Sequence, residues 1–84
     1  MKEKEQAIEE IICIIKAQLG RELKGEVTGD SLFREEISID SLDMVLIIGE
    51  IEDTYQVVID ESVMAELNSV NDVVDYIYKQ KVGI

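Results

Sequence analysis

The sequence predicts an all-α fold: a small bundle of three principal helices plus one short helix, with a long ordered loop between the first two helices. Apolar residues recur at spacings of three and four in three separate segments, which is the period of an amphipathic helix. The chain has 84 residues, enough for one small domain, which we expect to span residues 1–84. Ile, Val and Leu supply 28 of these residues, too many for a disordered acidic chain.

The first two predicted helices each carry one apolar stripe. Residues 3–19 form the first helix, and Gly20 is its expected stop because glycine commonly follows a last helical turn. Its stripe comprises Ile8, Ile11, Ile12, Ile15 and Leu19. Residues 41–55 form the second helix, with a stripe of Met44, Ile47, Ile48, Ile51 and Tyr55.

Two further helices are predicted in the last third of the chain. Residues 61–67 favour a short helix capped by Asp60, and residues 55–59 are interpreted as a linker because helical patterns flank them. The last helix is opened by Ser69 as a candidate N-cap, with Asp72 three residues later. Its stripe comprises Val70, Val73, Val74 and Ile77.

Residues 20–40 show no clear period and contain three glycines. A connection of this length in a small domain usually indicates function or disorder. The scattered apolar residues favour a loop that is pinned onto the core: Leu23, Val27, Leu32, Phe33, Ile37 and Ile39.

Composition excludes several classes of function. The net charge of −11 argues against nucleic-acid binding, which needs Lys and Arg to neutralise phosphates. The longest apolar run has five residues, too short for membrane insertion, and no secretory signal opens the chain, so we expect a cytoplasmic monomer. Cys13 is the single cysteine, and no acidic pair has calcium-loop spacing, so neither a disulfide framework nor a metal site is expected. Without histidine there is no ordinary nucleophile–base pair, which argues against an enzyme.

The second predicted helix has a second apolar face, opposite its stripe. At 100° per residue this face carries Leu42, Val45, Leu46 and Gly49, followed by Glu52 and Asp53. An apolar patch rimmed by acids is typical of a docking surface. The alternative is that the short helix covers part of it.

Charge is segregated along the sequence. Twelve acids and no Lys or Arg lie between Glu35 and Tyr78. Such a field steers a basic partner towards it, although a solvated surface that only aids solubility has the same composition.

The start of the second helix combines Asp40 as N-cap with Ser41 as the first helical residue. Unpaired N–H groups and the helix dipole favour a negative substituent there, so the Ser41 hydroxyl suits the attachment of a phosphodiester. Serine and aspartate also occur at helix starts for capping alone.

The stretch Phe33-Arg34-Glu35-Glu36-Ile37-Ser38-Ile39-Asp40-Ser41-Leu42-Asp43 resembles the acyl carrier protein family around its phosphopantetheine-bearing serine. The likeness continues through residues 50–55, 58–61 and 69–77 and covers nearly the whole chain. It implies that Ser41 carries 4′-phosphopantetheine, added from coenzyme A by a phosphopantetheinyl transferase. The thiol of the arm would hold acyl groups as thioesters, and the helices would shelter part of the acyl chain.

The resemblance also implies roles for neighbouring residues. Asp40, Leu42 and Asp43 would flank the attachment site and assist recognition by the transferase. The face that basic, acyl-transferring and chain-elongating enzymes read would comprise Val45, Leu46, Gly49, Glu52, Asp53 and Glu61. The chain departs from the family pattern at four positions: Ser38 replaces a usual glycine, Ile39 a small residue, Leu46 a frequent acid and Gly49 a larger apolar residue.

The cargo and one rival function stay open. The carrier would serve fatty acid synthesis or a specialised acyl or polyketide pathway, or would carry an aminoacyl unit such as D-alanine. The rival is a non-catalytic acidic helical interaction module that is never modified.

Overall fold

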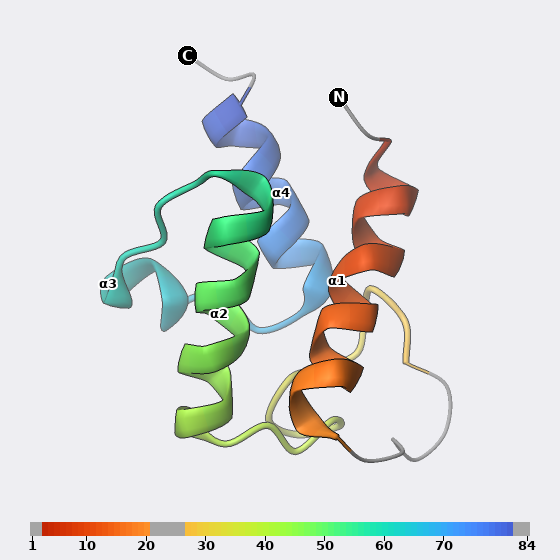
Figure 1. The fold of residues 1–84 in the computed structure, drawn as a ribbon. Helices are drawn as coiled ribbons and strands as arrows, with labels where there is room; N and C mark the ends of the chain where they lie inside the picture. The colour runs from red at the N-terminus through yellow and green to blue at the C-terminus, as the bar shows by residue number, and fades with distance from the viewer. Residues whose placement is uncertain (1–2, 21–26, 82–84) are drawn as a thin grey trace.

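The computed structural model describes residues 3–20 and 27–81 and contains four helices (Figure 1). They are α1 (Lys4–Leu19), α2 (Ser41–Tyr55), α3 (Glu61–Met64) and α4 (Val70–Lys81). Within those residues the structure has no strand, only an isolated bridge between Leu32 and Ser69. The predicted all-α bundle is therefore confirmed. None of the described helices is long and apolar enough to cross a membrane.

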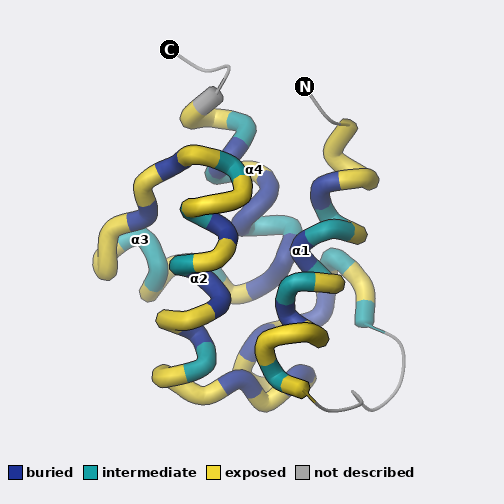
Figure 2. Tube along the Cα trace, viewed as in Figure 1, coloured by how far each residue is buried: buried dark blue, intermediate teal, exposed yellow. Residues whose placement is uncertain are grey.

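The core lies where α1 packs against α2 and α4 (Figure 2). The predicted stripes of α2 and α4 are buried, except that Tyr55 is half-buried. On α1 the most deeply buried residues are Ala7, Ile11 and Ile15, while Ile8, Ile12 and Leu19 are half-buried. The buried stripe of α1 therefore includes Ala7 as well as Ile11 and Ile15, because this helix packs against both α2 and α4.

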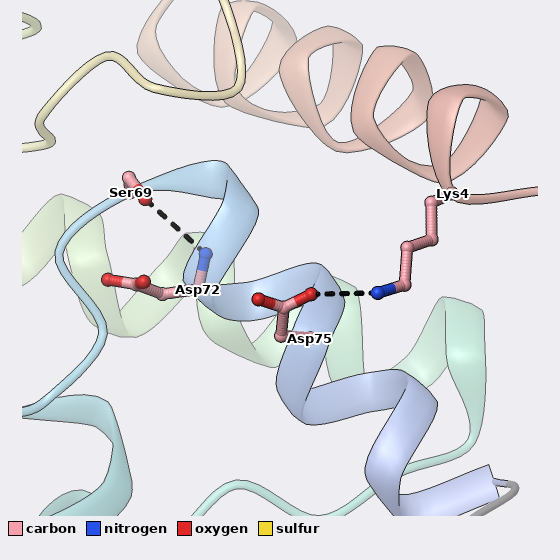
Figure 3. A network of polar contacts seen from close by, with 4 residues as sticks. All are labelled: Lys4, Ser69, Asp72 and Asp75. Atoms are coloured by element: carbon pink, nitrogen blue, oxygen red, sulfur yellow. Dashed lines mark hydrogen bonds and ion pairs between the residues drawn. The ribbon is translucent and has the colours of Figure 1, made fainter.

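The ends of α1 and α4 follow the predicted capping rules. Gly20 has the left-handed φ of 63°, and its N–H donates to the Lys16 carbonyl at 3.0 Å, which ends α1. Ser69 Oγ accepts from the Asp72 N–H at 3.3 Å, as expected for the N-cap of α4 (Figure 3). The Asp72 carboxylate accepts from the Asn68 N–H at 2.9 Å, one residue earlier than in a capping box.

The short helix is shorter than predicted. It ends at Met64, and residues 65–67 form tight turns in which Glu66 N–H donates to the Val63 carbonyl and Leu67 N–H to the Met64 carbonyl. Asp60 occupies the predicted N-cap position, but its side chain makes no capping hydrogen bond. A helix of one turn has little intrinsic stability, and α3 has no fully buried residue to hold a longer one.

The long loop before α2 is pinned to the core over its described part, residues 27–40. Phe33, Ile37 and Ile39 are buried, while Leu32 lies at the surface and contributes its backbone bridge to Ser69 instead of an apolar anchor. Phe33 N–H donates to the Asn68 carbonyl at 2.8 Å, which joins the loop to the segment before α4. The predicted anchor Leu23 lies outside the described residues.

Candidate functional site: the N-terminal end of helix α2

Ser41 is the first residue of α2 and is exposed. Asp40 precedes it in extended conformation, and its carboxylate accepts from the Asp43 N–H at 2.8 Å. This is the N-cap interaction predicted from the sequence, and it fixes the first turn of the helix. The Ser41 hydroxyl therefore stands on a rigid helix end, next to backbone N–H groups that favour a negative charge.

The segment before Ser41 is anchored to the hydrophobic core by two buried side chains. Ile37 and Ile39 are 4% and 3% exposed, so they anchor the chain on both sides of Ser38. Ile39 N–H donates to the Phe33 carbonyl at 2.8 Å, which closes the loop on itself. Ser38 adopts φ 63°, a left-handed conformation that suits glycine, and glycine is the residue that the resemblance led us to expect there.

A small pocket of ≈ 40 Å³ adjoins the first turn of α2. It lies between the loop, α2 and the turn after α3, and its lining comprises Phe33, Arg34, Glu35, Met44, Met64, Ala65, Leu67 and Asn68. Its size admits a water molecule or a methyl group and little more.

Three apolar side chains of α2 are exposed beside Ser41. Leu42 is 71%, Val45 54% and Leu46 47% exposed, so α3 leaves most of this face open to solvent. A Cβ added at Gly49, one further turn along, would meet no atom within 4 Å. The second face of α2 is thus open over about two turns, from Leu42 to Gly49. We call Leu42, Val45, Leu46 and Gly49 the α2 patch.

The acids expected beside the α2 patch lie in different surroundings. Asp53 and Glu61 are exposed, the latter as the first residue of α3. Glu52 is half-buried, and its carboxylate accepts from the Ile59 N–H at 2.8 Å. Glu52 therefore holds the connection between α2 and α3 in addition to bordering the patch.

Two surface residues were not singled out from the sequence. Val58 is 71% exposed and lies between buried Val57 and Ile59. This alternation of buried and exposed side chains was the signal for an exposed Val58, and the interpretation of residues 55–59 as a plain linker did not use it. Arg34 lines the pocket, a position that the sequence did not predict.

Two further expectations from the sequence concern Cys13 and metal binding. Cys13 is exposed on α1. Among the described residues, no group of three or more metal-binding side chains lies together.

Comparison with known proteins agrees with this geometry. The family described as "Phosphopantetheine attachment site" matches residues 9–77, which include all of α2 and its capping residues.

Curated proteins named "Acyl carrier protein" are similar over most of their length. The protein of Lactococcus lactis subsp. cremoris is 41% identical over 73 residues, covering 87% of this chain and 94% of the relative. That of Rhodococcus erythropolis is 40% identical over 75 residues, covering 89% and 81%. That of Exiguobacterium sibiricum is 32% identical over 77 residues, covering 92% and 96%. The chain belongs to the acyl carrier protein family, whose members bear phosphopantetheine and act as carriers, not as catalysts.

Proposed function

We propose that Ser41 is the attachment point of the phosphopantetheine arm and that the chain carries acyl groups on it as thioesters. The observation that carries this proposal is the exposed hydroxyl at the first position of α2, beside the Asp40 cap. A phosphodiester at this position gains from the helix dipole and from N–H groups that have no helical partner.

The attachment itself requires another enzyme. The Ser41 oxygen bonds to the phosphorus next to the pantetheine part of coenzyme A, the phosphoanhydride bond breaks, and the nucleotide part leaves. The hydroxyl proton must pass to a base, and the sequence contains no histidine that could take it. We assign that base to a phosphopantetheinyl transferase, with Asp40, Leu42 and Asp43 as its recognition residues.

The α2 patch and its acids are the proposed docking surface for partner enzymes. Exposed Leu42, Val45 and Leu46 offer apolar area, while Asp53, Glu61 and the part-exposed Glu52 supply negative charge around it. An enzyme with a basic surface would be steered to this end of the bundle by the net charge of −11.

The cargo is proposed to be an acyl group of fatty acid synthesis or of a specialised acyl or polyketide pathway. The ≈ 40 Å³ pocket beside the first turn of α2 is the proposed entry for the acyl chain, which would have to widen it. Leu46 and Gly49 stand where the resemblance led us to expect an acid and a larger residue, so the α2 patch supports specialised partners. An aminoacyl cargo such as D-alanine is the alternative within the family.

Mass spectrometry tests the attachment. The protein is incubated with coenzyme A and a transferase of broad specificity, and its intact mass is measured. We expect a gain of one phosphopantetheine, none for Ser41→Ala, and a normal gain for Ser62→Ala, which removes an exposed hydroxyl from α3. A folded protein that gains no mass would instead be the acidic interaction module. Intact mass of the protein from its native host identifies the cargo.

A further inference from the structure

Arg34 is isolated in the charge pattern of the chain. Between Val27 and Tyr78 it is the single Lys or Arg in the sequence, and Glu35 follows it directly. Its guanidinium makes no ion pair or hydrogen bond with any other residue of the described segments 3–20 and 27–81. An arginine in a strongly acidic surface would be expected to pair with a neighbouring carboxylate, so its charge is left available for another anion.

The fold brings Arg34 close to the attachment site. The hydrogen bond from Ile39 N–H to the Phe33 carbonyl joins the two ends of the loop, so Arg34 and Asp40 each lie one residue from this contact. Arg34 also lines the pocket together with Met44, which is one helical turn beyond Ser41. Arg34 therefore belongs to the same end of the bundle as Ser41 and borders the pocket beside the first turn of α2.

The polarity of the pocket indicates the kind of group that would bind there. Its apolar lining comprises Phe33, Met44, Met64, Ala65 and Leu67, and Arg34, Glu35 and Asn68 are polar. The Asn68 backbone groups are already bonded, its carbonyl to Phe33 N–H and its N–H to Asp72. A neutral acyl chain gains nothing from a cation at the pocket, whereas carboxylate and phosphate oxygens bind the arginine fork with two hydrogen bonds.

We propose that Arg34 binds an anionic oxygen of the loaded arm beside this pocket. This inference rests on the proposed attachment at Ser41. The anion is the carboxylate at the free end of an acidic acyl group or the phosphodiester that joins the arm to Ser41. Arg34 offsets the repulsion that the surrounding acids exert on either group, so it makes the carrier suited to acidic cargo.

The test compares arms of matched length. Wild type, Arg34→Gln and Lys79→Gln are loaded with the succinyl or the butyryl arm from the corresponding coenzyme A thioesters, and loading is verified by intact mass. Lys79 is an exposed cation near the end of α4, so its variant matches the charge change without touching the pocket. Thermal midpoints are measured for these forms, for the free-thiol form and for the unmodified protein.

With a carboxylate ligand, Arg34→Gln lowers the midpoint of the succinyl form by roughly 1–5 °C more than that of the butyryl form. With the phosphodiester as ligand, Arg34→Gln lowers all modified forms alike and leaves the unmodified protein unchanged. Lys79→Gln shows neither pattern. The Arg34 side-chain N–H resonance, followed by NMR, should shift in the same forms, which a purely structural effect would not produce.

An Arg34→Gln effect that is equal in unmodified and modified protein overturns the inference while leaving the attachment at Ser41 intact. Absence of any mass gain overturns the proposed function and this inference together. The two failures are therefore distinguishable.

Discussion

The carboxylate of Glu52 on α2 accepts a hydrogen bond from the backbone N–H of Ile59 at 2.8 Å. The contact spans seven residues and ties the last turn of α2 to the connection that leads to α3. Tyr76 on α4 holds the same connection, since its hydroxyl donates to the Val58 carbonyl at 2.9 Å. An acid expected to serve partner docking thus also stabilises the fold.

We expect Glu52→Ala to lower the free energy of unfolding by about 1–3 kcal/mol, because the Ile59 N–H loses a charged acceptor. Asp53→Ala removes the same charge from an exposed neighbour and should change it by no more than about 0.5 kcal/mol. Urea titration of both variants provides the measurement. Glu52→Gln keeps an acceptor oxygen, so it should remain stable while weakening association with a basic partner. Equal stability of the two alanine variants would contradict this structural role.

Gly49→Ala should stabilise the protein by about 1 kcal/mol, because alanine is the better helix former and the added Cβ meets no atom within 4 Å. Gly20→Ala is the matched control, since Gly20 has φ 63° and alanine is strained there. Chemical denaturation should therefore move the two midpoints in opposite directions. A destabilised Gly49→Ala would indicate that the glycine is needed for the backbone of α2.

Ser38→Gly should raise the free energy of unfolding by up to about 1 kcal/mol, since Ser38 holds φ 63° and glycine adopts this conformation without a steric penalty. The same exchange at Ser62, in the first turn of α3, should instead destabilise the protein. Thermal unfolding of the pair checks both signs. A loss of stability in Ser38→Gly would show that the serine side chain contributes more than the strain costs.

Because the pKa of the Tyr55 hydroxyl is raised in the folded protein, we expect the protein to lose stability in alkali. Burial and the neighbouring Glu10 carboxylate raise this pKa above the ordinary value of about 10. Above that pH the unfolded chain releases the proton while the folded protein keeps it, so stability is complete below about pH 10 and falls as the pH rises. Tyr55→Phe should lessen this fall in urea titrations across that range. An identical slope in the variant would contradict the assignment.

Raising the salt concentration from about 0.01 M to about 0.3 M near neutral pH should increase the thermal midpoint, because a net charge of −11 repels itself and salt screens that repulsion. Differential scanning calorimetry measures the effect. A midpoint that does not respond to salt would mean that self-repulsion contributes little to the stability of this fold.

Much of the architecture could be predicted because helical burial is periodic. The stripes of α2 and α4 and the caps at Asp40 and Ser69 depend on residues within one or two turns of each other, so the sequence contains their cause. The extent of α3 could not be predicted in this way. Its residues have helical spacing, but no partner buries them fully, and the bond between Phe33 N–H and the Asn68 carbonyl joins the segment that follows to the distant loop.

The candidate site likewise combines features set by local sequence with features set by contacts between distant segments. Ser41, its cap and the exposed α2 patch follow from local helix geometry and were predicted from the sequence. The structural contact of Glu52 and the position of Arg34 at the pocket were not, because they depend on how separate segments approach each other.

The sequence by itself determined the class of this protein: an acidic, all-helical chain with a serine at a capped helix start, and hence its resemblance to acyl carriers. Only the tertiary structure decided which acids are committed to the fold and that Arg34 borders the pocket without an acidic partner among the described residues. Lys4 illustrates the difference, since it pairs with Asp75 across 71 residues, from α1 to α4 (Figure 3). The physical reason is range: capping and helical periodicity act within a few residues, whereas pairing of charges depends on distances that the packed core sets.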